Sequence, residues 1–295
     1  MPEPARVLKG IDMHTHIPPR GGRDADPRAD QKERYFKSPT LGMDVDQMAE
    51  LYRGLGMMAV VFGVDRSTAA TNTFDGNDYV AEAMQKYPDV FIGWASVDPW
   101  AGEAAVKELE RSVTQLGLKG LKLHPITQAF FPNKRRFYPL YELAQSLNIP
   151  VVFHTGHTGI GAGTPGGTGL KLKYSRPIPY IDDVAADFPN LTIIGAHPSW
   201  PWQEEMLSVA LHKSNVYIDL SGWSPKYFSP TLIQYGSTLL QDKVLFGSDF
   251  PVISPERWLK DFAEAPFRDE VRPKILLENA LRLLKRGPDG RELTA

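Results

Sequence analysis

Short runs rich in Val, Ile, Leu and Phe recur along the whole chain, and their alternation with amphipathic segments limits the possible folds more than any other feature. Runs that are apolar throughout are typical of strands covered on both faces, as parallel strands are. We expect eight such strands, at residues 8–14, 58–64, 91–97, 118–124, 150–154, 192–197, 216–220 and 244–249.

The segments between most of these runs have helical spacing. We expect helices at residues 78–86, 101–116, 139–147, 180–188, 201–212 and 227–240, and closing helices within 256–285. Strands that alternate with helices in single file predict βαβ units, and eight units predict a closed α/β barrel, the (β/α)8 or TIM barrel, formed by residues 1–295 as a single domain. A doubly wound open sheet is the alternative fold. It is disfavoured because no Gly-x-Gly-x-x-Gly turn follows the first strand.

Composition excludes several classes of function. The net charge of −2 gives no basic excess for a nucleic acid or an anionic membrane, so we expect neither as a partner. The absence of cysteine excludes disulfides, thiolate zinc sites and cysteine nucleophiles, and it fits a cytoplasmic location. The start of the chain lacks the apolar core of a signal peptide, and no run of 18 apolar residues predicts a membrane span. We expect a small-molecule substrate, and a homodimer stays an open alternative.

Two connecting segments are long for a compact domain. Residues 17–40 follow the first strand, and residues 155–179 follow the fifth strand and include a glycine-rich stretch at 161–169. Both leave the carboxyl ends of strands, where barrel enzymes place their active sites. We interpret them as substrate loops.

Histidines gather where the predicted strands end. Five of the seven histidines lie at or just beyond such ends, and Asp249 ends the eighth strand in the same way. The five are His14, His16, His124, His154 and His197. The period of two in a strand puts His14 and His16 on one side, and the strand ends of a barrel converge on one mouth. Imidazole nitrogens with a carboxylate oxygen suit Zn²⁺, Mn²⁺ or Fe²⁺, and we expect Zn²⁺ first.

Four segments resemble the amidohydrolase superfamily: Ile-Asp-Met-His-Thr-His at 11–16, Phe-His-Thr-Gly at 153–156, Gly-Ala-His at 195–197 and Phe-Gly-Ser-Asp-Phe-Pro at 246–251. The chain is similar in particular to the amidohydrolase-related branch that includes aminocarboxymuconate-semialdehyde decarboxylase, over residues 11–284. The resemblance implies a metal held by His14, His16, His154 and Asp249. It implies His197 close by, as an acid/base or an additional ligand.

The turn after the sixth strand departs from the decarboxylases of this branch. It carries Pro-Ser-Trp-Pro-Trp at 198–202, where they have a glycine-rich turn. We therefore expect a metal-dependent hydrolase that attacks a carbonyl-adjacent bond of an aryl β-ketoacyl compound, a lactone or an amide. Asp249 would take the proton of metal-activated water, and His197 would polarise the carbonyl or protonate the leaving group. One alternative is a non-oxidative decarboxylase of an aromatic or muconate-type acid. Another is a non-catalytic barrel that only binds a ligand.

Several assignments stay open. His157 lies three residues after His154, and either could be the fifth-strand ligand; we favour His154 because it ends the apolar run. Lys122 shares parity with His124 on the fourth strand. It is either the carbamate bridge of a two-metal site or, as we expect for one metal, a contact to a substrate oxyanion or carboxylate. We assign His124, His157 and the aromatic Trp200 to substrate binding as well.

Overall fold

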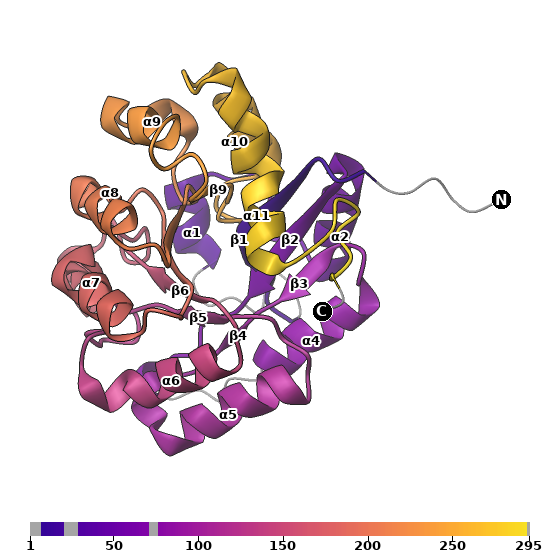
Figure 1. Cartoon of the computed structure of the whole chain (residues 1–295). Coiled ribbons are helices and arrows are strands. Elements are labelled where there is room, and N and C mark those ends of the chain that lie inside the picture. The colour runs from indigo at the N-terminus through magenta and orange to yellow at the C-terminus, as the bar shows by residue number, and fades with distance from the viewer. Residues whose placement is uncertain (1–6, 21–28, 71–75, 294–295) are drawn as a thin grey trace.

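The structure, a computed structural model, describes residues 7–20, 29–70 and 76–293. Parallel strands form its centre and helices surround them (Figure 1). The strands are β1 (Gly10–His16), β2 (Met57–Phe62), β3 (Phe91–Gly93), β4 (Ala95–Ser96), β5 (Leu121–Leu123), β6 (Val151–His154), β7 (Ile193–Ala196), β8 (Val216–Asp219) and β9 (Val244–Leu245). They pair in chain order, as β1-β2-β3 and as β4 to β9.

Two junctions join these sheets into one closed barrel. Trp94 separates β3 from β4, yet its amide donates to Val61 at 2.9 Å, so the two short strands continue one another. Its ring packs over Gly120, where no side chain would fit. At the other junction the Met13 amide donates to the Phe246 carbonyl at 2.9 Å. Within the described residues, β1 to β9 thus fill eight strand positions, and the predicted (β/α)8 fold is confirmed.

The helices follow the strands in the predicted order. They are α1 (Ala29–Phe36), α2 (Val45–Leu55), α3 (Ser67–Ala70), α4 (Gly76–Lys86), α5 (Glu103–Thr114), α6 (Tyr138–Ser146), α7 (Pro177–Asp187), α8 (Gln203–His212), α9 (Pro230–Gly236), α10 (Pro255–Glu264) and α11 (Asn279–Leu284). Single turns lie at η2 (Pro99–Ala101), η3 (Arg135–Phe137), η4 (Pro165–Gly169), η5 (Leu172–Ser175), η6 (Pro225–Tyr227), η7 (Asp269–Val271) and η8 (Lys274–Glu278).

Capping chemistry sets several of these boundaries. Asp44 and Gln47 form a capping box at the start of α2, which ends at Gly56 in the left-handed conformation. Ser229 caps α9 ahead of Pro230, so that helix begins later than the predicted 227, and η6 occupies the earlier residues.

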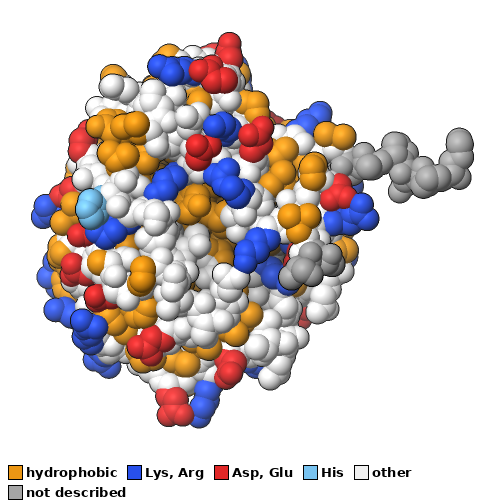
Figure 2. All heavy atoms as spheres, viewed as in Figure 1, with side chains coloured by type: hydrophobic (Ala, Val, Ile, Leu, Met, Phe, Trp, Pro, Cys, Tyr) orange, Lys and Arg blue, Asp and Glu red, His pale blue; other side chains and the backbone are white. Residues whose placement is uncertain are grey.

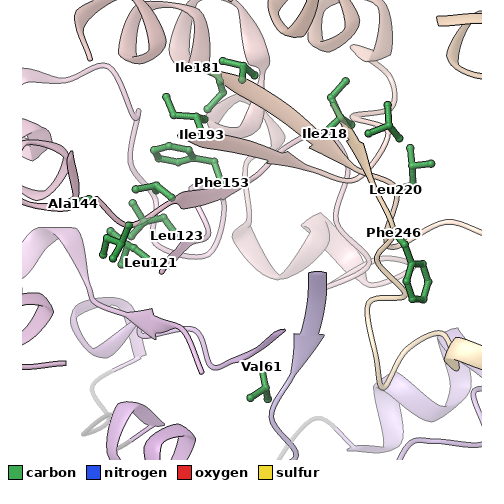
Figure 3. Packing of buried hydrophobic residues seen from close by; sticks show 14 of the residues in the cluster. Val61, Leu121, Leu123, Ala144, Phe153, Ile181, Ile193, Ile218, Leu220 and Phe246 are labelled. Atoms are coloured by element: carbon green, nitrogen blue, oxygen red, sulfur yellow. The ribbon is translucent and has the colours of Figure 1, made fainter. Parts of the chain in front are cut away.

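Side chains alternate between two apolar layers along each strand. One layer packs between strands and helices: Figure 3 shows Phe153 and Ile193 on neighbouring strands, with Ile181 of α7 beside them. The other layer, which we call the interior cluster, fills the inside of the barrel. It consists of Leu8, Ile11, Met13, Met58, Val60, Phe62, Ile92, Trp94, Val152, Ile194, Ala196, Leu245 and Ala280. Ala280 belongs to α11, so this last helix packs against the amino-terminal end of the barrel.

On the face shown in Figure 2, basic and acidic side chains are interspersed. Among the described residues, no helix combines the length and apolar character needed to cross a bilayer.

The two long connecting segments contain short helices. The segment at 17–40 contains α1, and its residues 21–28 lie outside the described part of the chain. The segment at 155–179 contains η4 and η5. They touch each other, because the Phe36 ring at the end of α1 packs on Gly159, leaving no room there for a side chain.

Candidate metal centre at the barrel mouth

Strand β1 carries a bulge directly before the site. Its pairing with β2 advances from Asp12 opposite Ala59 to Thr15 opposite Val61, so three steps on β1 match two on β2. A bulge bends its strand and re-aims the side chains that follow. Two consecutive residues within the bulge therefore face the inside of the barrel: Met13 belongs to the interior cluster, and the His14 ring packs against Phe62 of that cluster.

His14 and His16 both contact Asp249, which lies just after β9. Asp249 Oδ1 is 3.5 Å from His14 Nε2 and 3.2 Å from His16 Nε2. Asp249 has a φ of 70°, a left-handed conformation that is uncommon outside glycine. Its amide donates to the His14 carbonyl at 2.9 Å, which helps to hold that conformation. The first and last strands thus bring their functional side chains together.

Three donor atoms converge at this point. Nitrogen atoms of His14 and His197 and an oxygen of Asp249 all lie within 4.8 Å of one another. The two histidines are buried and Asp249 is half-buried. His197 follows β7 and, like Asp249, has a left-handed backbone, with a φ of 72°. Strained backbone of this kind is concentrated at functional sites. His16 stands outside the group of three and reaches it through Asp249.

His154, at the end of β6, lies one contact away from the three donors. Its Nδ1 is 3.0 Å from His197 Nε2, and its ring stacks on His124 with the centroids 3.9 Å apart. Within the described part of the chain, the buried Nε2 of His154 has no hydrogen-bond partner. A buried polar atom without a partner calls for an explanation, and an unrecorded ion is one of the usual ones.

His157 lies away from these groups, on the rim of the mouth. Its ring is 5.5 Å from that of Trp200, which is 5.8 Å from Trp223. Trp200 is half exposed, at 52%. The structure therefore places His154 beside the converging donors and His157 in an aromatic wall beside them.

Lys122 is fully buried inside the barrel, on β5. Its Nζ lies 3.2 Å from His14 Nε2 and 5.0 Å from the centre of the Phe62 ring. Burial lowers the pKa of Lys122 to about 8, and Asp219 and Asp249 oppose that shift.

Asp219 and Ser221 are site residues that the sequence analysis missed. Asp219 ends β8, is fully buried, and its Oδ2 accepts from His14 Nδ1 at 2.9 Å. Ser221 Oγ lies 2.8 Å from His197 Nδ1 and donates to Asp219 Oδ1. A signal was present, since Asp219 is an acidic residue within the apolar run at 216–220.

Burial and neighbouring charges favour the neutral forms of His14, His124 and His154 and the ionised form of Asp249. Burial, and then the charge of Lys122, lower the pKa of His14 to about 3. Burial also puts the pKa values of His124 and His154 well below the usual range. Burial would raise the pKa of Asp249, but a hydrogen bond from His16 and the nearby histidines lower it overall.

This donor set fits a divalent metal ion. Neutral imidazoles and an ionised carboxylate are the protonation states that a metal requires. His14 Nδ1, the ring nitrogen on the far side from Asp249, is hydrogen-bonded to the carboxylate of Asp219. Metal-binding histidines usually have such a partner on their second nitrogen. The unpartnered Nε2 of His154 supplies one more donor nearby.

Known proteins resemble this chain over most of its length. A family model described as amidohydrolase matches residues 11–286. Gamma-resorcylate decarboxylase of Polaromonas sp. strain JS666 is 24% identical over 282 residues, which cover 82% of this chain and 85% of that protein.

Solved structures share the fold. The uncharacterized TIM-barrel protein Bb4693 of Bordetella bronchiseptica is 28% identical with a TM-score of 0.78, and the match covers 96% of this chain and 100% of that one. A dihydroxybenzoic acid decarboxylase of Polaromonas sp. JS666, solved with manganese and the inhibitor 2-nitroresorcinol, is 21% identical with a TM-score of 0.67. That match covers 96% of this chain and 99% of the other.

Proposed function

We propose that this chain, which belongs to the amidohydrolase family, is a metal-dependent decarboxylase of a small aromatic carboxylic acid. The family match over residues 11–286 confirms the resemblance drawn from the sequence motifs. The observation that carries the proposal is the convergence of donor atoms from His14, His197 and Asp249 within 4.8 Å at the mouth of the barrel.

The relatives favour decarboxylation over the hydrolysis that the sequence led us to expect. Gamma-resorcylate decarboxylase matches 82% of this chain, and that enzyme is named for removing a carboxyl group from an aromatic acid. The turn at 198–202, on which the hydrolase prediction depended, lies outside the predicted metal ligands. It changes the wall of the site and leaves the donor set as it is, so it is weak evidence about the reaction.

We propose that His14, His16, His154 and Asp249 hold the metal, with His197 beside them. The support is that Asp249 contacts both β1 histidines and that His154 offers an unpartnered nitrogen. We propose Zn²⁺ or Mn²⁺, because these donors suit zinc and a solved relative holds manganese. When bound, such an ion would supply a positive charge that stabilises negative charge on substrate oxygen atoms.

The chain itself must then supply one proton. In non-oxidative decarboxylation the bond from the ring carbon to the carboxylate breaks and its electron pair stays on that carbon. Carbon dioxide leaves, and a proton takes its place. We assign delivery of this proton to His197, the acid/base expected from the sequence, which lies beside the proposed metal ligands and can pass on a proton from water. Asp249 stays a carboxylate because its pKa is lowered.

Two further features suit an aromatic acid. Lys122 is a buried cation 3.2 Å from His14, and we propose that it contacts a substrate oxygen. His157, Trp200 and Trp223 line one side of the mouth, where a flat ring could stack. We propose that His124, whose ring stacks on the His154 ring, contacts the substrate beside His154.

The experiment that tests this proposal starts from metal-free protein. Chelator-treated enzyme is reloaded with Mn²⁺ or Zn²⁺ and incubated with 2,6-dihydroxybenzoate and related hydroxybenzoates, and carbon dioxide release is measured. We expect release only with metal. In D₂O the product should carry one deuterium on the carbon that lost the carboxylate.

Other results would overturn parts of the proposal. No carbon dioxide from any acid, with metal bound, would overturn the reaction. Aryl β-ketoacyl compounds and lactones are assayed in parallel in H₂¹⁸O, and label in the product would return the hydrolase prediction to first place. Protein that binds neither ion would overturn the metal centre and favour a barrel that only binds a ligand.

A further inference from the structure

Asp219 is the most heavily hydrogen-bonded carboxylate around the proposed metal centre. Its Oδ2 accepts from His14 Nδ1 at 2.9 Å. Its Oδ1 accepts from the Ser221 amide at 3.0 Å, from the His197 amide at 3.3 Å and from the Ser221 hydroxyl. The side chain is fully buried. A carboxylate surrounded by donors in this way accepts hydrogen bonds and has none to give.

This geometry fixes where His14 carries its proton. Because Asp219 accepts, the proton of a neutral His14 ring lies on Nδ1, and Nε2 keeps a free electron pair. The neighbour of Nε2 agrees with that assignment. Lys122 Nζ lies 3.2 Å from it, and an ammonium group can only donate.

The same reasoning extends through Ser221 to His197. A serine hydroxyl has one proton, and here that proton points to Asp219. Ser221 Oγ must therefore accept from His197 Nδ1, which lies 2.8 Å away. His197 then carries its proton on Nδ1, and its Nε2 is an acceptor.

The last link is His154. Its Nδ1 lies 3.0 Å from His197 Nε2, so it donates there. The Nε2 of His154 is left without a proton, and this buried atom has no partner among the described residues. The chain of bonds from one carboxylate thus ends on a nitrogen that can bind a cation.

We propose that Asp219 is a positioning residue that, directly and through Ser221, places the ring protons of His14, His197 and His154 on Nδ1. It thereby leaves the Nε2 atoms of His14 and His154 without a proton, which is the state that a metal ligand requires. The inference deepens the proposed function, since it rests on the same metal centre. Outer partners of this kind orient metal-binding histidines and fix their tautomers.

The test reads the ring protons directly. Full-length, metal-free protein with ¹⁵N-labelled histidine is studied by long-range ¹H–¹⁵N correlation, and signals are assigned with single His→Gln variants. We expect the Nδ1–H tautomer at His14, His154 and His197. Ser221→Ala should abolish that preference at His197 and His154 and leave His14 unchanged. Asp219→Asn should alter all three, because an amide can donate where the carboxylate accepts.

A matched control uses another buried carboxylate. Asp98 is buried and accepts from the backbone amides of Thr68 and Trp100, away from the histidines. Asp98→Asn should leave all three histidine signals unchanged. In Mn²⁺ titrations followed by electron paramagnetic resonance, Asp219→Asn should weaken binding by about 10- to 100-fold, and Asp98→Asn should not.

Several results would overturn the inference. These are an Nε2–H tautomer at His14 in the wild-type protein, unchanged tautomers in Asp219→Asn, or a Ser221→Ala effect that includes His14. Should Asp219→Asn fail to fold by circular dichroism, the Ser221→Ala pattern decides alone. The spectra need neither metal nor substrate. The predicted tautomers in a protein without decarboxylase activity would therefore support this inference while overturning the proposed reaction.

Discussion

The two ends of the barrel use the same strands for different purposes. On β6, Val152 belongs to the interior cluster, and His154, two residues further on, borders the proposed metal centre. On β7, Ile194 is in the cluster, and His197 follows the strand. Two residues of strand span about 7 Å, so the apolar and polar layers are directly stacked.

This difference separates the sources of stability and activity. The interior cluster has no ionisable group and is held by burial, whereas the mouth concentrates buried polar groups that burial alone would disfavour. Substitutions in the mouth should therefore change metal binding and activity, and substitutions in the interior cluster should change stability.

The largest effect should come from His14→Ala. It removes a proposed ligand and leaves Asp219 and Lys122 without their shared neighbour. Substituting a residue that only hydrogen-bonds to a metal ligand lowers activity by at most about 100-fold. We expect a larger loss of activity for His14→Ala, and elemental analysis should find almost no bound metal. His212→Ala, at an exposed histidine of α8, is the control. Full metal content in the His14 variant would refute its assignment as a ligand.

In the interior cluster, Leu245→Ala should lower the free energy of unfolding. Leu245 is fully buried on β9, and leucine-to-alanine changes in a packed core reduce the free energy of unfolding by about 2–5 kcal/mol. We expect that loss in urea denaturation, with KM unchanged. Leu239→Ala, at a side chain that is 68% exposed, should shift stability by no more than about 0.5 kcal/mol. A Leu245 variant with normal stability and an altered KM would contradict the separation between a stabilising interior cluster and a functional mouth.

A smaller effect should separate the rim from the metal centre. His157→Ala removes an aromatic contact of the kind that contributes about 0.5–1.5 kcal/mol, so we expect KM to rise about 2- to 10-fold with the metal retained. His154→Ala should instead lose metal. If instead the His157 variant lost the metal and the His154 variant kept it, the ligand at the end of β6 would be His157.

The smallest effect should lie outside both layers. Arg53 and Asp89 form a two-bond ion pair at 2.8 Å, with both side chains nearly half exposed. Asp89→Ala should lower the free energy of unfolding by about 1 kcal/mol at most, and the loss should shrink in high salt. Thermal unfolding at two salt concentrations measures both, and activity should be unchanged.

The strand order was predictable because a barrel of parallel strands buries both faces, which makes each strand an apolar run. The break at Trp94 was hidden within one such run, since the Trp94 ring packs over Gly120, the residue just before β5. Helix α1 was not predicted either, because its residues 29–36 are mostly polar.

The gathering of polar side chains at the barrel mouth was predictable wherever a polar residue ended an apolar run, as at His14, His154 and Asp249. Asp219 lies within the apolar run at 216–220, but its importance arises from a contact to His14, which is 205 positions away in the sequence. Ser221 carries no signal of its own, since a serine after a strand is ordinary turn chemistry. Contacts of this kind exist only once the barrel has closed.

The bulge in β1 makes the proposed chemistry depend on how many residues the strand contains as well as on which they are. Three steps between Asp12 and Thr15 match two on the neighbouring strand. An even ladder from Asp12 onward, with every residue kept, would pair His14 with Val61 and turn the side chains of His14 and His16 to the outer face of the barrel. An enzyme with all its histidines intact would then present them to the wrong side of the wall, which no comparison of residue identities would reveal.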